Sequence, residues 1–226
     1  MRKIILFTVL AVNILSILSG CATFRSGIKG EFEGEGGKNI GAEKVDVLFV
    51  FSHYKQVKGY DAIPKLENKH QIINDFDDLF IDAMTEFSNI NRYTTFTEYA
   101  SDVSEPKRRI EKDSLVATHD YVMRIKFMKE ISFSRQFLGS LFSTVTVTVL
   151  PIPYKRNYSV TIDVFNHEDI LLKNYTRQAS LTKWVQTLLI FVYPFHTERR
   201  KAEEIYINLM HDVFQQVETE KILIKN

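Results

Sequence analysis

Apolar residues recur along the chain with two different periods, and the change of period predicts the order of the secondary structure elements. From residue 44 onward, short apolar runs and strict alternation indicate strands, whereas apolar positions three and four residues apart indicate helices. The expected strands are 45–51, 93–99, 119–133, 158–165 and 170–181, and the expected helices are 68–87, 104–114 and 198–217. This order predicts an α/β (α+β) domain with a single mixed sheet of about five strands and two to three helices packed on it, in the order β-α-β-α-β-β-β-α.

Two longer apolar runs, 137–154 and 184–195, stand apart from this pattern. The residues 136–154 include no charged side chain, and neither do 184–195. Both runs end in proline and aromatic residues followed by cations, a combination that membrane interfaces favour. Three interpretations stay open: buried core, a membrane or self-association surface, or a membrane-spanning segment. The residues expected to make membrane or assembly contacts are Phe137, Leu138, Leu141, Phe142, Leu150, Tyr154, Trp184, Leu188, Leu189, Phe191, Tyr193 and Phe195.

The N-terminal residues have the three parts of a secretory signal peptide. Arg2 and Lys3 are basic, residues 4–18 are mostly apolar, and Leu18-Ser19-Gly20-Cys21 follows. These four residues resemble the lipobox of bacterial lipoproteins, in which the cysteine becomes the first residue of the mature chain. The resemblance implies a signal peptide over 1–20. It also implies a diacylglyceryl group on the Cys21 thiol and an acyl chain such as palmitate on its amino group. An ordinary secretory signal with an incidental cysteine is the alternative.

Residues 21–43 are expected to form a flexible tether between the lipidated cysteine and a single domain over 44–226. Six of the nine glycines lie between Gly27 and Gly41, among polar residues, and such a composition is typical of a flexible coil. Ala22 follows the cysteine where an aspartate would favour the inner membrane. By that resemblance, the protein is expected at the outer membrane, facing the periplasm.

Composition excludes some functions and leaves others open. The chain has 29 basic and 28 acidic residues, so removal of Arg2 and Lys3 leaves 27 against 28 and a net charge of −1. That balance argues against nucleic acid as a partner. Cys21 is the only cysteine, so a lipidated chain has no thiol for a disulfide or for catalysis.

No catalytic motif, metal-ligand spacing or cofactor motif is found, and the sequence predicts a protein that is not an enzyme and has no cofactor. The six histidines do not form a metal-binding pattern, and His167-Glu168-Asp169 is expected in a solvated hairpin turn. Nucleophile-elbow, phosphate-loop and metalloprotease motifs are missing from the sequence.

The order of elements resembles a group of bacterial envelope domains. The residues that support this are the strand 45–51, a helix ending Phe87-Ser88-Asn89, the strand 92–96, a long strand opening at His119, and the hairpin 158–181. The group includes curli-secretion lipoproteins, N-terminal domains of Tol translocation proteins and lipoprotein activators of penicillin-binding proteins. It implies assembly, secretion or partner regulation and no catalytic residue.

Together these features predict a membrane-anchored lipoprotein that acts as a non-enzymatic envelope binding or assembly module. Its partners would be the lipid membrane, through acylated Cys21, and an envelope protein or further copies of itself. One alternative is an oligomeric pore or secretion-channel component that inserts its apolar segments into the membrane. A second alternative is a small-ligand binder or hydrolase.

Overall fold

The fold was analysed in a computed structural model, which describes residues 20–67, 76–134, 137–138, 141, 152–186 and 198–224. The strands are β1 (Gly20–Arg25), β2 (Val45–Lys58), β3 (Lys65–Leu66), β4 (Ile90–Glu98), β5 (Tyr121–Ser132), β6 (Ile152–Asn166) and β7 (Leu171–Gln186). The helices are α2 (Phe76–Met84), the 3₁₀ helix η1 (Ala100–Ser104), α3 (Pro106–Ala117) and α5 (Glu198–Thr219).

The strands form one mixed sheet, which confirms the predicted fold class. Its order is β1-β7-β6-β5-β2-β3, and β4 also pairs with β2. β2 runs parallel to β4 and β5, whereas the other neighbours are antiparallel. The five expected strands correspond to β2, β4, β5, β6 and β7, and the structure adds β1 and β3.

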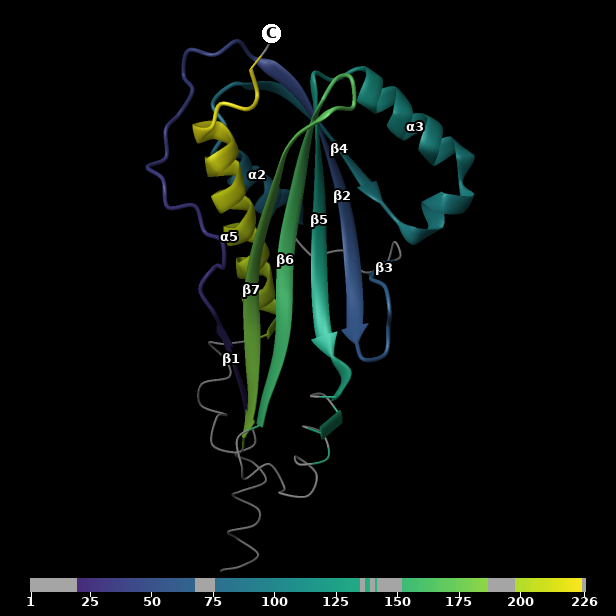
Figure 1. Cartoon of the computed structure of the whole chain (residues 1–226), viewed down its shortest axis with the longest axis vertical. Coiled ribbons are helices and arrows are strands. Elements are labelled where there is room, and N and C mark those ends of the chain that lie inside the picture. The colour runs from purple at the N-terminus through teal and green to yellow at the C-terminus, as the bar shows by residue number, and fades with distance from the viewer. Residues whose placement is uncertain are drawn as a thin grey trace, which may run out of the picture.

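Helices cover the two faces of the sheet unequally. α2 and α5 lie against one face, and α3 lies across the other face near β2 and β4 (Figure 1). The main core therefore lies between the sheet and α5, whose residues Ile205, Leu209, Val213 and Val217 are buried as their spacing predicts. A smaller core below α3 includes Leu48, Val50, Phe96 and Val122.

Phe49 occupies the centre of the main core. Its ring packs edge-on against Phe80, with 4.9 Å between centroids, and also contacts Phe51 and Phe214. β2 is buried on both of its faces over residues 47–52, because helices cover both sides of this part of the sheet. This explains why its sequence reads as a continuous apolar run without alternation.

The turn between β6 and β7 lies where the sequence predicts a hairpin. Asn166 Oδ1 accepts hydrogen bonds from the backbone N–H groups of Glu168 and Ile170, at 3.1 and 2.9 Å. Asp169 has a φ of 58°, a left-handed conformation that aspartate tolerates better than most residues. His167 is solvent-exposed in this turn, as expected.

The expectation of a flexible tether over 21–43 is corrected by the structure. β1 pairs with the edge strand β7, and the backbone of Lys29 exchanges hydrogen bonds with Gln178. Further along, the Phe32 N–H donates to Asp212 Oδ1 at 2.9 Å and the Asn39 N–H donates to Glu218 Oε1 at 2.7 Å. These residues are ordered because polar groups of β7 and α5 form hydrogen bonds with their backbone N–H and carbonyl groups. We call residues 20–39 the N-terminal strap.

Gly30 shows why one of the strap's glycines is needed. Its φ is +81°, and a Cβ at this position would lie 3.4 Å from the Thr176 carbonyl oxygen. A side chain would therefore meet backbone strain, because L-residues rarely adopt this φ. The glycine-rich composition thus allows the strap to lie close to β7.

Candidate functional site

One end of the sheet gathers Cys21 and parts of both apolar runs. β1 begins at Gly20, β6 begins at Ile152 and β7 ends at Gln186, and the register aligns Cys21 and Ile152 with Val185. β5 also ends toward this end, at the lower edge of the sheet in Figure 1. Cys21 and one end of each apolar run are thus brought together by strand pairing, although they are far apart in sequence.

The described part of the first apolar run is exposed to solvent. Phe137, Leu138 and Leu141 are 54%, 51% and 49% exposed. The Phe137 ring stacks on Phe133, which also faces Tyr60, with 6.1 Å between centroids in both pairs. We call these five residues the apolar tip. Their exposure does not fit the buried-core interpretation for this part of the run.

The other predicted contact residues divide into two groups. Tyr154 lies in β6 and Trp184 lies in β7, where Trp184 pairs with Pro153. The residues outside the described part of the chain are Leu18, Ser19, Phe142, Leu150, Leu188, Leu189, Phe191, Tyr193 and Phe195. Among the described residues, no helix combines the length and apolar character that a membrane crossing requires.

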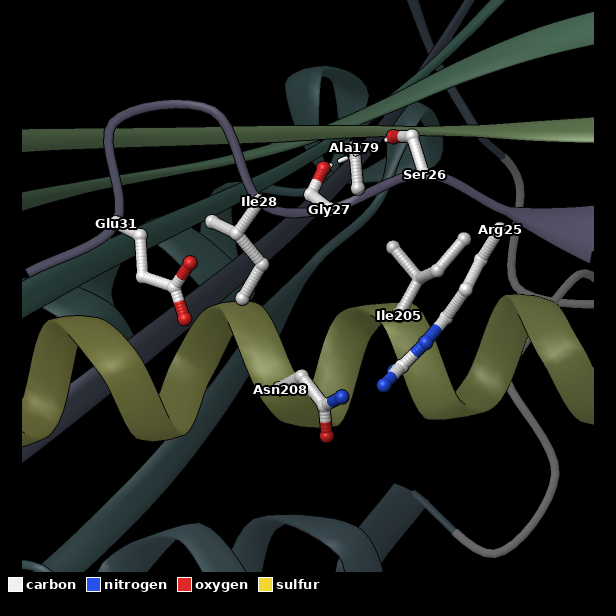
Figure 2. A pocket seen from close by; sticks show the side chains of 8 residues that line it. All are labelled: Arg25, Ser26, Gly27, Ile28, Glu31, Ala179, Ile205 and Asn208. Atoms are coloured by element: carbon white, nitrogen blue, oxygen red, sulfur yellow. Dashed lines mark hydrogen bonds between the residues drawn. The ribbon is translucent and has the colours of Figure 1, made fainter.

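A cavity of about 270 Å³ lies between the strap and α5, a short distance along β1 from Cys21. Figure 2 shows Arg25 reaching from the strap toward Asn208 on α5, with Glu31 at the other side of the space. The Asn208 amide accepts from the Arg25 guanidinium when its oxygen is turned toward it. Opposite charges therefore line the cavity, and its volume suits a small polar molecule.

The described part of the cavity lining includes one hydroxyl side chain. This hydroxyl, on Ser26, donates to the Gly27 carbonyl oxygen at 2.9 Å and accepts from the Ser180 N–H at 2.9 Å. Among the described residues, neither a histidine nor a carboxylate forms a hydrogen bond with Ser26 that would activate it. Within the described ranges, no group of three His, Cys, Asp or Glu residues suits a metal ion.

A buried ion pair joins β7 to α5, and its carboxylate also accepts a hydrogen bond from the strap; sequence reasoning missed this pair. The Arg177 Nε–H on β7 donates to Asp212 on α5, both residues are less than 10% exposed, and Arg177 also donates to Gln216. Asp212 accepts the Phe32 N–H through its other carboxylate oxygen. In the sequence, the pair is indicated only by a charged residue on each of two apolar faces, Arg177 and Asp212. Their pairing could not be predicted, because it depends on how α5 crosses β7.

His211 links α5 to the end of α2. Its Nδ1 lies 2.8 Å from Glu86 Oε1, and its Nε2 lies 3.1 Å from Asp82 Oδ2. Burial disfavours the charged imidazolium, but hydrogen bonds and charge from Glu86 and Asp82 outweigh this effect and raise the pKa of His211 above its ordinary 6.5. The protonated ring can donate to both carboxylates at once and so join α5 to the end of α2.

This arrangement predicts how folding stability depends on pH. Because the folded pKa of His211 is raised, its contribution is fully present below about pH 6.5 and is lost as the pH rises through the folded pKa. Urea unfolding at a series of pH values measures this slope. We expect His211→Gln to lack that part of the slope, and parallel pH profiles for the two proteins would contradict the assignment.

Comparison with known proteins finds only distant likenesses. No family model matches the chain, and no curated protein matches it. Two solved structures are partly similar, the PelC dodecamer from Paraburkholderia phytofirmans at 9% identity and a point variant of it at 8%. Both alignments cover 88% of this chain, cover 98% and 99% of those chains, and have a TM-score of 0.32. At this level the likeness does not indicate a shared family or function.

Proposed function

We propose that this protein is a lipid-anchored, non-enzymatic module of the bacterial envelope that binds a protein partner or further copies of itself. The observation that supports this most directly is the position of Cys21 in β1, at the sheet end from which both apolar runs extend. Cleavage before Cys21 would make an acylated residue part of an edge strand. The lipid would then join the folded domain without a flexible spacer.

Attachment of the lipid to β1 would fix how the domain is oriented relative to the membrane. A free tether would let the domain turn in any direction, whereas an acyl group on β1 holds one end of the sheet at the membrane surface. The apolar tip lies at that same end, with Phe137, Leu138 and Leu141 about half exposed. Exposed apolar side chains favour lipid or a protein partner over water. The proposed location is the outer membrane, with the domain facing the periplasm.

Depth-dependent quenching of a single tryptophan tests this orientation. We expect Leu138→Trp, made in a Trp184→Phe background, to be quenched several-fold more strongly by brominated phospholipids than Leu172→Trp. Leu172 is a matched control because it is 40% exposed but lies near the opposite end of the sheet, at the start of β7. Equal quenching at the two positions would contradict the proposed orientation.

The assembly part of the proposal has a separate test. Cross-linking after extraction in mild detergent should capture either a second copy or another envelope protein through the apolar tip. A strictly monomeric product with no captured partner counts against a binding or assembly role.

A pore or secretion-channel component is the second candidate, favoured by the same exposed apolar tip. It differs in requiring that the apolar segments hold the protein in the membrane even without lipid on Cys21. A small-ligand binder or hydrolase is a weaker candidate. Its supporting feature is the cavity beside Arg25 and Glu31, where Ser26 forms no hydrogen bond with a base among the described residues.

A further inference from the structure

A second cavity, of about 330 Å³, lies on the side of the sheet that α3 covers. Its walls are formed by β2 and β3, by the end of β4, by η1 and by the first half of α3. It shares no residue with the cavity between the strap and α5, and it lies far along the chain from Cys21.

Part of the lining is apolar and largely aromatic. Tyr54 on β2 is paired with Leu66 on β3, and both are half-buried. Phe96 on β4 belongs to the smaller core below α3, so the cavity lies at the edge of that core. Val103 on η1 also lines the cavity and is 78% exposed. These side chains offer an apolar surface that a small ring can cover.

Contacts within the protein hold this part of the lining in place. The Arg108 guanidinium on α3 lies over the Phe96 ring, 4.0 Å from its centre, and donates to the Thr97 carbonyl oxygen at 2.6 Å. At the start of η1, the Tyr99 N–H donates to Asp102 Oδ2 at 3.1 Å. A ligand therefore has little of this surface to order, which lowers the entropic cost of binding.

Arg109 is the lining cation that has no partner among the described residues. It is solvent-exposed on α3 and forms neither a hydrogen bond nor a salt bridge with them. It lies three residues before Lys112, which also lines the cavity, so the two side chains share one side of the helix.

The other two lining cations already have carboxylate partners within the protein. These pairs are Arg108 with Asp102 at 3.4 Å, Arg108 with Glu111 at 3.1 Å, and Lys112 with Glu98 at 2.7 Å. An anionic ligand can therefore pair with Arg109 without displacing a carboxylate of the protein. The planar guanidinium can donate two parallel hydrogen bonds to a carboxylate.

We propose that this cavity binds a small aromatic molecule with one carboxylate group. Its ring would lie against Tyr54 and Leu66, and its carboxylate would accept hydrogen bonds from Arg109. A volume of about 330 Å³ is at the lower end of the range for ligand sites and suits one ring with a short acidic side chain. The inference goes beyond the proposed function and does not depend on the lipid anchor.

Isothermal titration calorimetry of the full chain in mild detergent tests this proposal. The probes are hydrocinnamate, which has a phenyl ring and a short carboxylate side chain, and its uncharged amide. The same titrations into detergent alone are subtracted. We expect the carboxylate to bind about tenfold more tightly than the amide, because a hydrogen bond between charged groups contributes more than a neutral one.

Two variants with exposed positions test the site without disturbing the core. Arg109→Gln should weaken binding of the carboxylate by about tenfold and leave binding of the amide unchanged. Val103→Glu places a negative charge in the lining and should likewise weaken binding of the carboxylate alone.

Lys107→Gln is the matched control. Lys107 is also exposed on α3 and has the same charge, but it does not line the cavity. This variant should bind both probes like the wild type. The proposal is overturned if the wild type does not bind hydrocinnamate at low-millimolar concentration, or binds it no more tightly than the amide. It is also overturned if Arg109→Gln binds the carboxylate as tightly as Lys107→Gln.

Discussion

Replacing Cys21 with serine is expected to release the protein from the membrane almost completely. Each buried methylene of an acyl chain contributes about 0.8 kcal/mol, so two or three long chains provide most of the membrane affinity. A net charge close to zero adds no general attraction to anionic lipid. The measurement is the share of protein in the soluble fraction after separation of membranes.

The pairing of β1 with β7 decides which variant can be used. Deletion of residues 22–43 would remove β1 from the sheet edge, so a point substitution is needed to separate anchoring from folding. The Cys21→Ser chain should be exported with a conventional cleavable signal, because the lipoprotein peptidase requires the cysteine. Ala22→Ser is the control and should stay membrane-bound.

The outcome separates the two leading functions. Release of the Cys21→Ser chain supports a tethered module that uses the apolar tip for a partner. Retention after an alkaline wash would instead show that the apolar segments hold the protein without lipid, as the pore alternative requires. Mass spectrometry of the wild type must also find Cys21 at the N-terminus with its acyl groups, or the anchoring proposal is wrong.

Asp212→Ala is expected to destabilise the fold by about 3–5 kcal/mol, because Arg177 would remain buried without its counter-charge. The same change removes the acceptor of the Phe32 N–H, so the strap should detach from α5 near this residue. Chemical denaturation in non-ionic detergent measures the free energy of unfolding. Amide hydrogen exchange over residues 26–39 measures the detachment.

Two further variants make this interpretation specific. Asp113→Ala removes an exposed carboxylate on α3 and should change stability by less than about 0.5 kcal/mol. The double variant Arg177→Met with Asp212→Leu removes both charges and should recover most of the lost stability. If the double variant is as unstable as Asp212→Ala, the loss does not come from an uncompensated charge.

Much of the architecture could be predicted from residue periodicity because helices and strands depend on local spacing. The pattern of β2, the turn at Asn166 and the apolar face of α5 all lie where the sequence indicated. The lipobox expected at Cys21 is also read from local features, namely adjacent residues and their distance from the N-terminus, and it stays a prediction.

Contacts between segments that are far apart in the sequence could be identified only from the folded structure. The glycine-rich composition of residues 20–39 indicates a coil. In the folded chain, however, β1 pairs with the edge strand β7, and residues 20–39 lie along the domain as the strap. Arg177 meets Asp212 only because α5 crosses β7. Lys55 faces Lys129 because β2 and β5 are neighbours in the sheet but not in the sequence. Periodicity tells which face a side chain occupies, whereas long-range strand order and register select the partner that it meets there.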